Sequence, residues 1–137
     1  VHGSDNSLLM NGTKVRDLIT TMGDIHHIFP KGYLQKNKIT DKSKYNQIAN
    51  YTYLDTQTNI SIGEKAPNEY FKTVFEQCVS KEMKFGNISD TALVKENLSI
   101  NCIPENVVSM DATHYEDFLL ERRKLMAKKI KDYYNSL

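Results

Sequence analysis

The sequence predicts a helix-rich α+β fold in which a short two-stranded hairpin is packed by flanking helices. Two runs of β-type residues, at 24–29 and 51–54, suit a pair of short strands. Apolar residues recur at helical spacing in two later segments, at 67–78 and 111–133. The chain has 137 residues, of which 39% are hydrophobic and 26% charged, so we expect one globular domain with its own core.

The first twelve residues differ from the rest. We expect residues 1–12 to be a disordered start or a cloning scar, because the chain does not begin with methionine and opens with the string Val1-His2-Gly3-Ser4. Residues 13–137 are then predicted to form a single domain. We expect this domain to be the C-terminal fragment of a larger protein.

Local signals surround the first strand. Thr13 can cap a helix that leads into the strand, and Gly23 suits the end of that helix. The apolar positions of this helix fall on one face and are Val15, Leu18, Ile19 and Met22. After the strand, residues 30–39 are predicted to form a loop with one helical turn at residues 33 and 34. Polar, cationic residues continue this loop up to residue 44.

Two helices are predicted directly after the second strand. Asp55 or Thr58 can cap a short helix at 59–64, which places Asn59 in its first turn. Pro67 stands at the start of the next helix, whose apolar positions are Phe71, Val74, Phe75 and Cys78. Cys78 is therefore predicted to be a buried apolar side chain.

The last third of the chain is predicted to contain two more helices. Asp90 can cap a short helix with Leu93 facing the core, and residues 104–110 are predicted to be extended or turn-like. Asp111 can cap the final helix, whose apolar stripe is Tyr115, Phe118, Leu119, Met126, Ile130 and Tyr133. Arg122 falls within that stripe, and we expect it to reach back to a carboxylate.

The charges nearly balance over the whole chain. There are 18 Lys and Arg against 17 Asp and Glu, a net charge of +1, so total charge does not indicate a polyanionic partner. Two local clusters are strongly basic. The first is Lys31, Lys36, Lys38, Lys42 and Lys44, and the second is Arg122, Arg123, Lys124, Lys128, Lys129 and Lys131.

Cysteine and hydropathy patterns restrict the class of protein. The two cysteines, Cys78 and Cys102, are far apart and form no CxxC pair, which argues against a disulfide scaffold or a zinc ribbon. No window has the apolar length of a membrane span, and the N-terminus lacks the pattern of a signal peptide. We therefore expect a cytoplasmic protein without a membrane partner.

Two adjacent histidines, His26 and His27, stand in the first strand. Metal-dependent cleavage of a phosphodiester needs metal ligands and a neutral base, and an imidazole with a pKa of about 6.5 suits either role. Asn59 could add an amide oxygen as a ligand, and Asp24 lies on the same strand face as His26. Because neighbours on a strand point to opposite faces, the two histidines share one site only if the strand ends there. Pro30 and Gly32, which follow the pair, favour such an end.

At these residues the chain resembles the HNH, or ββα-metal, nuclease motif. The resemblance begins with the string His26-His27-Ile28-Phe29-Pro30 and continues with Asn50 and Asn59. The wider strings, which are Ile48-Ala49-Asn50-Tyr51-Thr52-Tyr53-Leu54-Asp55, Thr58-Asn59-Ile60-Ser61-Ile62 and Pro67-Asn68-Glu69-Tyr70, are similar to the C-terminal HNH domain of GmrSD-type, modification-dependent restriction endonucleases. The resemblance covers about residues 14–134 and is sharpest at 24–71.

The resemblance implies a ββα-metal core and a role for each site residue. His27 would be the general base, and His26 and Asn59 would be metal ligands. Asn50 would be counted with His27 among the catalytic residues, because it would pin the loop through side-chain hydrogen bonds. Asp24 could ligate the metal directly or through water, or act as an outer partner of the ligands.

The resemblance also implies a cofactor, a substrate and a partner. A divalent metal is expected, Mg²⁺ or Mn²⁺ first, with Ni²⁺ or Zn²⁺ also possible because His26 stands where many HNH sites have aspartate. The expected reaction is hydrolysis of DNA with a 3'-hydroxyl leaving group and a 5'-phosphate product, in restriction or defence. An N-terminal nucleotide-handling domain is the expected partner. The residues expected to contact nucleic acid are Lys31, Lys36, Lys65 and Arg123.

Three other interpretations remain open from the sequence. The chain could be an HNH-shaped module that binds nucleic acid with weak or no cleavage. It could hold a structural zinc through one of the histidines with Cys78 and Cys102, although these cysteines lack the local pairing of such sites. RNA could replace DNA as the substrate, because no base-reading motif decides between them.

Overall fold

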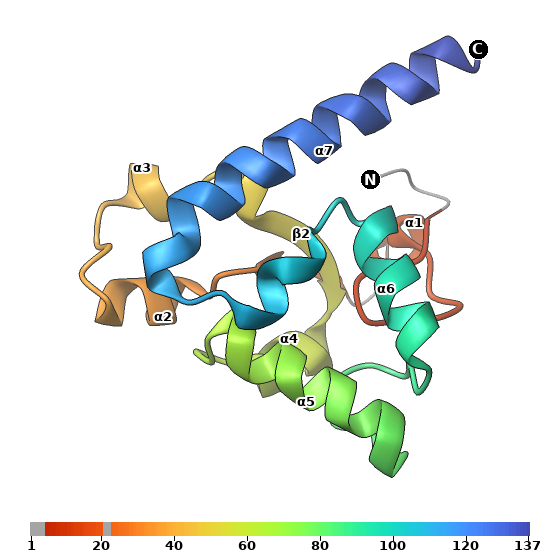
Figure 1. Ribbon diagram of the computed structural model, residues 1–137, viewed down its shortest axis with the longest axis horizontal. Helices are drawn as coiled ribbons and strands as arrows, with labels where there is room; N and C mark the ends of the chain where they lie inside the picture. The colour runs from red at the N-terminus through yellow and green to blue at the C-terminus, as the bar shows by residue number, and fades with distance from the viewer. Residues whose placement is uncertain (1–4, 21–22) are drawn as a thin grey trace.

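The computed structural model describes residues 5–20 and 23–137, and confirms a helix-rich α+β fold with one two-stranded antiparallel sheet (Figure 1). The elements, in chain order, are α1 (Val15–Thr20), β1 (Gly23–His27), α2 (Lys31–Lys36), α3 (Lys42–Tyr45), the 3₁₀ turn η1 (Ile48–Asn50), β2 (Tyr51–Asp55), α4 (Thr56–Ile62), α5 (Pro67–Ser80), α6 (Thr91–Ile100), the 3₁₀ turns η2 (Glu105–Ser109) and η3 (Ala112–His114), and α7 (Tyr115–Asn135).

The hairpin forms where the β-type residues predicted it. β1 and β2 pair from Gly23 opposite Asp55 to His27 opposite Tyr51. β1 ends at His27, two residues before the predicted end of the strand, and Ile28 adds one more backbone bond by donating to the Asn50 carbonyl at 2.8 Å. Helices flank the hairpin (Figure 1), while Ile25 of β1 is 56% exposed, so one face of the hairpin reaches the surface.

The prediction of a loop at residues 30–39 is wrong at 31–36, which form α2, although the helical turn expected at residues 33 and 34 lies within this helix. Pro30 has φ −56° and ψ 140° and stands at the N-cap of α2, where its missing N–H costs nothing. Helix α2 buries Leu34, and the Tyr33 hydroxyl accepts a hydrogen bond from the backbone N–H of Ala112 at 2.7 Å. Tertiary packing therefore makes a helix of a segment whose proline and glycine indicated a loop.

The cationic segment after α2 also contains a helical turn that the sequence analysis missed. The Asp41 carboxylate accepts from the Ser43 backbone N–H at 2.9 Å and caps α3. This turn buries Tyr45, which lies at the edge of the core. The segment at 42–45 is therefore fixed against the core, whereas its lysines remain exposed.

Helix α4 begins three residues earlier than predicted. Of the two candidate caps, Asp55 is the one used, because its carboxylate accepts from the Thr58 backbone N–H at 3.1 Å. Asn59 is consequently the fourth residue of the helix instead of its first. Because Asp55 is also the last residue of β2, α4 follows the hairpin without a loop and packs against both strands.

Helix α5 contributes the predicted apolar face to the core. Phe71, Val74 and Cys78 are buried, and Phe75 packs partly buried against the same cluster. Phe29, just after β1, lies 4.8 Å from Phe118 of α7 between ring centroids. The core therefore joins α5, the end of the hairpin and the first half of α7.

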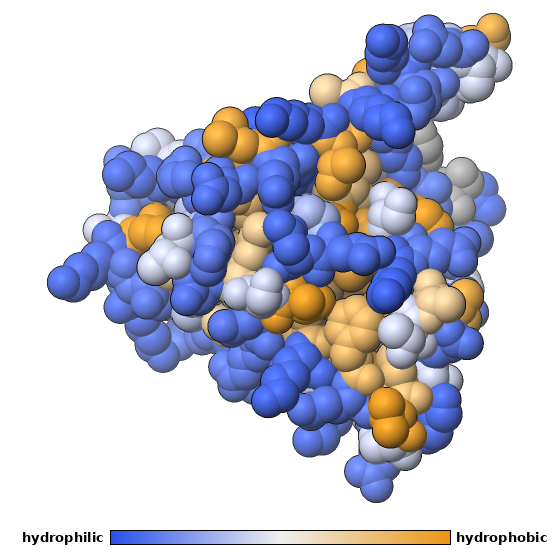
Figure 2. Space-filling view, viewed as in Figure 1, coloured by the Kyte–Doolittle hydropathy of each residue, from blue (hydrophilic) through white to orange (hydrophobic). Residues whose placement is uncertain are grey.

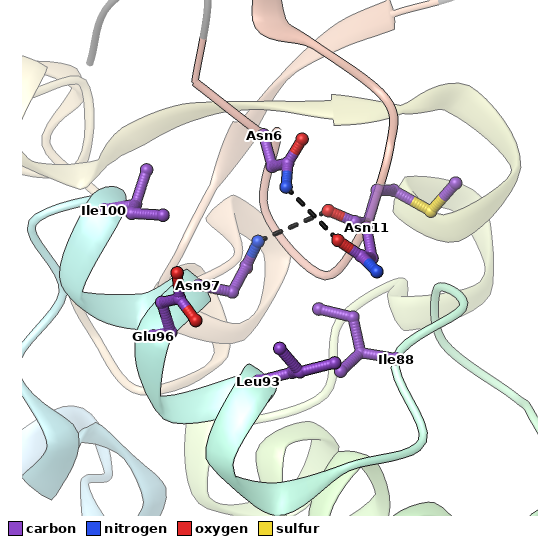
Figure 3. Close-up of a pocket in the computed structure, with 8 residues that line it drawn as sticks. Asn6, Asn11, Ile88, Leu93, Glu96, Asn97 and Ile100 are labelled. Carbon is purple, nitrogen blue, oxygen red and sulfur yellow. Dashed lines mark hydrogen bonds between the residues drawn. The ribbon is translucent and has the colours of Figure 1, made fainter.

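The predicted cap of α6 is confirmed, but its predicted inward face is wrong. Asp90 accepts from the Ala92 backbone N–H at 2.8 Å, whereas Leu93 is 40% exposed. The buried residues of the helix are Val94, Asn97 and Leu98. Leu93 lies instead at the edge of a small surface pocket between α6 and the N-terminal segment (Figure 3).

The N-terminal segment at residues 5–12 is part of the fold, so the expectation of disorder is wrong there; residues 1–4 lie outside the described residues. Leu8 and Leu9 are buried. The Asn97 side chain holds this segment, because its carbonyl accepts from the Leu9 backbone N–H at 2.8 Å and its amide donates to the Ser7 carbonyl at 3.0 Å. Hydrogen bonds across about 90 residues of sequence therefore order the start of the chain.

The predicted helix before the hairpin is present as α1. Val15 is buried, as its place on the apolar face predicts, while the predicted positions Leu18, Ile19 and Met22 lie outside the described side chains. Gly23 does not end the helix but is the first residue of β1.

The last helix begins later than predicted and leaves the core. Asp111 caps the turn η3 instead of α7 itself, which starts at Tyr115. Phe118 is buried as predicted, but Ile130 and Tyr133 are 56% and 46% exposed, so the apolar stripe is wrong beyond the first half. The C-terminal part of α7 projects away from the body of the protein (Figure 1).

Candidate metal and catalytic site

The strand β1 separates its two histidines. Pairing continues through His26 opposite Thr52 and His27 opposite Tyr51, so the two side chains point to opposite faces. His26 is 2% exposed and turns toward α4, whereas His27 is partly exposed. The strand does end at His27, as a shared site requires, but each ring has its own neighbours.

Three of the predicted metal-site residues lie together on the His26 side. The His26 Nδ1 and the Asn59 Oδ1 are 2.8 Å apart, and the Asn59 Nδ2 donates to the Asp24 carboxylate at 3.4 Å. Asp24 and His26 share a strand face because they are two residues apart, and α4 presents Asn59 to that face. The structure therefore brings together Asp24, His26 and Asn59.

The His26 ring is electrically neutral at neutral pH. Its burial lowers the pKa to about 4; the hydrogen bond to Asn59 opposes this, and the charges of His27 and Arg122 reinforce it. Since Asn59 uses its amide N–H toward Asp24, its oxygen faces the His26 Nδ1. With the ring proton on Nδ1 this contact is a hydrogen bond, whereas with the proton on Nε2 the Nδ1 lone pair is free for a metal.

Tyr70 stands at the other nitrogen of the same ring. Its hydroxyl oxygen lies 3.5 Å from the His26 Nε2, and it donates its own proton to the Ile28 carbonyl. Because its hydroxyl proton is used in the bond to Ile28, this oxygen can accept a hydrogen bond from Nε2 when Nε2 carries the ring proton. Tyr70, to which the sequence analysis gave no role, therefore suits a tautomer in which Nδ1 is free to bind a metal.

The donor set on this face fits a divalent metal. It offers one imidazole nitrogen that is unprotonated at neutral pH, one amide oxygen and one carboxylate, which are a borderline nitrogen and two hard oxygens. Within residues 5–20 and 23–137, no group of three or more His, Cys, Asp or Glu side chains is placed to hold a metal. A metal held by Asp24 and His26 would take further ligands of another kind, such as the Asn59 amide oxygen or water.

His27 is held by the side chain of Asn46. Its Nε2 lies 3.0 Å from the Asn46 Oδ1, and the Tyr51 ring meets the imidazole edge-on at 5.0 Å between centroids. Because an amide oxygen accepts hydrogen bonds, Nε2 carries the proton and Nδ1 keeps the lone pair. The sequence analysis gave Asn46 no role, and its place after a helical turn gave no signal of this one.

Asn50 braces the loop between the two histidines and the core. It is fully buried; its Oδ1 accepts from the Phe29 backbone N–H at 2.8 Å, and its Nδ2 donates to the carbonyls of Phe29 and Tyr45 at 3.1 and 3.4 Å. These bonds agree with the pinning role that the resemblance implies. The residue fixes where the chain turns after β1.

Arg122 does not reach a carboxylate, contrary to expectation. The guanidinium is buried and donates to the carbonyls of Ala49, Tyr51 and Asn101, at 3.0, 2.5 and 3.1 Å. Burial lowers its pKa to about 10, and the nearby Cys102 and Tyr70 act in the opposite direction. Arg122 thus ties α7 to the start of β2 and to the end of α6, and its position within an apolar stripe was the signal of burial.

The four basic residues expected to contact nucleic acid lie in two places. Lys31 sits over the Tyr45 ring, 5.6 Å from its centroid, and Tyr45 also neighbours His27. Arg123 donates to the Gln47 side chain at 3.0 Å, one residue from Asn46. The other two are near the end of α4, where Lys36 pairs with Glu64 and Lys65 donates to the Ser61 carbonyl at 3.4 Å.

The alternative zinc site finds no support in the structure. Cys78 and Cys102 are both buried and free, and the Cys78 thiol donates to the Val74 carbonyl at 3.4 Å. Neither belongs, with a histidine, to a metal-binding group in the described part of the chain. None of the described helices has the length and apolar character needed to cross a membrane.

Comparison with known proteins gives one relative. An uncharacterised protein of the archaeon Methanocaldococcus jannaschii is 30% identical over 117 residues, a match that takes in 77% of this chain and 20% of the archaeal protein. The chain therefore spans about a fifth of the length of that relative. No family model matches the chain. No solved structure gives a significant match.

Proposed function

We propose that this chain is the HNH-type unit of a metal-dependent DNA endonuclease that acts in restriction or defence. The observation that carries the proposal is that Asp24 and His26, on one face of β1, lie together with Asn59 of α4. His27 follows His26 directly in the strand. We further propose that the chain acts in the cytoplasm together with a nucleotide-handling domain. The cytoplasmic location and the partner domain both rest on the resemblance of the motif to HNH nucleases.

In the proposed site, His26, Asn59 and Asp24 hold a divalent cation, Mg²⁺ or Mn²⁺ first, with Ni²⁺ or Zn²⁺ also compatible with the imidazole. When bound, the cation supplies positive charge for the oxygens of the scissile phosphate. Burial keeps His26 neutral, which ligation requires, and Tyr70 offers an acceptor for the ring proton.

His27 is the proposed general base. The hydrogen bond from Nε2 to Asn46 leaves the lone pair on Nδ1, which can take a proton from the attacking water. The water oxygen bonds to phosphorus as the 3'-oxygen leaves, so the products are a 5'-phosphate and a 3'-hydroxyl. Lys31 and Arg123, which approach the His27 side, are the proposed contacts to the DNA backbone there.

The test is nicking of supercoiled plasmid with Mg²⁺, Mn²⁺, Ni²⁺ or EDTA, with His27→Ala beside the unaltered protein. We expect metal-dependent nicking that falls by about 10²–10⁴ in His27→Ala, the usual contribution of a general base. The matched control is His114→Ala, because His114 is an exposed histidine whose ring serves only the cap of η3. Equal losses in both variants, or equal nicking by His27→Ala and unaltered protein, would contradict the role of His27.

A second candidate is a nucleic-acid-binding module with weak or no cleavage. One observation favours it: His26 is buried and its Nδ1 is engaged by Asn59, so the ligand set is closed by its own hydrogen bonds. Duplex DNA binding in EDTA without nicking under any metal, by protein whose circular dichroism shows it folded, would select this candidate. Binding followed by metal-dependent nicking would eliminate it.

A further inference from the structure

The C-terminal half of α7 is an exposed basic arm. Residues 123–137 are exposed except for Met126 and Lys129, which are partly buried, and this end of the helix projects from the body of the protein (Figure 1). In the space-filling view the projecting part is covered largely by hydrophilic residues (Figure 2). Its exposed cations are Arg123, Lys124, Lys128 and Lys131.

Three of these cations form one stripe. Lys124, Lys128 and Lys131 stand at positions i, i+4 and i+7, which share a helix face. At about 100° per residue they lie roughly opposite Arg122, the buried residue of the helix, so they point to solvent. The stripe is about 10 Å long, at 1.5 Å per residue. It can therefore follow successive phosphates of a nucleic-acid strand.

In the described part of the chain, Lys124, Lys128 and Lys131 have no ion pair, while Lys129 on the inner side pairs with Asp5. Two acidic residues stand within one turn of the stripe, Glu121 before Lys124 and Asp132 after Lys128. Like charges at i and i+4 destabilise a helix by a few tenths of a kcal/mol per pair. A polyanion along the stripe removes this repulsion, and its charge is the complement of this surface.

The stripe follows, in sequence, a residue that contacts the segment next to the partner of His27. Arg123 precedes Lys124 and donates to the Gln47 side chain, and Gln47 follows Asn46, the hydrogen-bond partner of His27. A duplex that enters on the His27 side can therefore continue along the arm. The first cluster of lysines and this arm then contact one backbone at two places.

We infer that Lys124, Lys128 and Lys131 bind the phosphate backbone of duplex DNA that flanks the site, without reading its sequence. The inference rests on the proposed function, since DNA is the substrate proposed there. It assigns to the projecting half of α7 the task of holding the duplex by electrostatic attraction.

The experiment measures binding of a short duplex by fluorescence anisotropy, in EDTA, between about 50 and 200 mM salt. The arm variant carries Lys124→Gln, Lys128→Gln and Lys131→Gln. The control variant has the same change in net charge at exposed lysines on α5, the following loop and α6, namely Lys72→Gln, Lys84→Gln and Lys95→Gln. Circular dichroism verifies that both variants keep the helical content of the unaltered protein.

We expect the slope of log affinity against log salt to fall by about 2 to 3 in the arm variant, at roughly 0.9 per lost phosphate contact, and by less than about 1 in the control. An unchanged slope in the arm variant, or an equal fall in both variants, overturns the inference. The readout is independent of cleavage: absence of nicking together with the expected slopes refutes the endonuclease and leaves the arm in place. Nicking together with unchanged slopes leaves the endonuclease in place and refutes the role of the arm.

Discussion

Lowering the pH from 6.5 to 4 should destabilise the fold through His26. In the unfolded chain this histidine titrates near 6.5, whereas burial away from water lowers its pKa to about 4 in the folded protein. Between these values the unfolded chain binds a proton that the folded protein excludes. The free energy of unfolding therefore rises with pH across this window, and the stability is lost as the pH falls through it.

The size of the effect follows from the two pKa values. Their difference, 6.5 against 4, at 1.36 kcal/mol per pKa unit gives about 3 kcal/mol between the ends of the window. That is a large part of the 5–15 kcal/mol that stabilises a typical domain. The hydrogen bond to Asn59 acts against the shift, so removing it should widen the window.

The assay is urea unfolding in EDTA, followed by far-ultraviolet circular dichroism because the chain has no tryptophan. The unaltered protein is compared with His26→Gln, in which this titration is absent, so that the acid response of the carboxylates cancels in the difference. From pH 6.5 to pH 4, the free energy of unfolding of the unaltered protein should fall by about 3 kcal/mol relative to that of His26→Gln. A difference that stays constant with pH would refute the burial of a neutral His26.

Three further predictions use the same unfolding measurement. Asn50→Ala should cost about 2–4 kcal/mol, because the buried Phe29 N–H loses its acceptor; a loss below about 1 would contradict the brace. Val94→Ala should cost about 2 kcal/mol and Leu93→Ala less than about 1, since the first is buried and the second is 40% exposed; equal losses would refute this orientation of α6. Arg122→Met should cost about 3 kcal/mol through three carbonyls left without their donor, and unchanged stability would show that these bonds contribute nothing.

Several elements could be predicted because their signals are local. β-branched and aromatic residues at 51–54 suit a pleated backbone whatever surrounds them, and this strand formed as predicted. Asp55 and Asp90 cap helices through bonds to backbone groups two or three residues away. The same locality explains the error at α2, because Pro30 can stand in a loop or at a helix start, and only the burial of Leu34 decides between them.

The candidate site was predicted as a set of residue types, but not as a geometry. The sequence alone placed Asp24 and His26 on one strand face, because strand periodicity fixes which residues share a face. Asn59 was added for its amide oxygen and from the resemblance of the motif. The sequence left open how far β1 extends and what each histidine touches. The partners that decide this, Tyr70 for His26 and Asn46 for His27, are 44 and 19 residues away.

The sequence by itself determined the hairpin and the caps Asp55 and Asp90, since these depend on backbone preference and on spacing of two to four residues. The candidate residues came from their types and from the resemblance of the motif. Only the tertiary structure decided that Arg122 donates to carbonyls up to 73 residues away instead of to a carboxylate, and that α7 leaves the core after its first half. The physical reason is that burial and hydrogen-bond partners depend on which distant segments meet. The periodicity of one helix cannot tell whether the surface that would cover it is present.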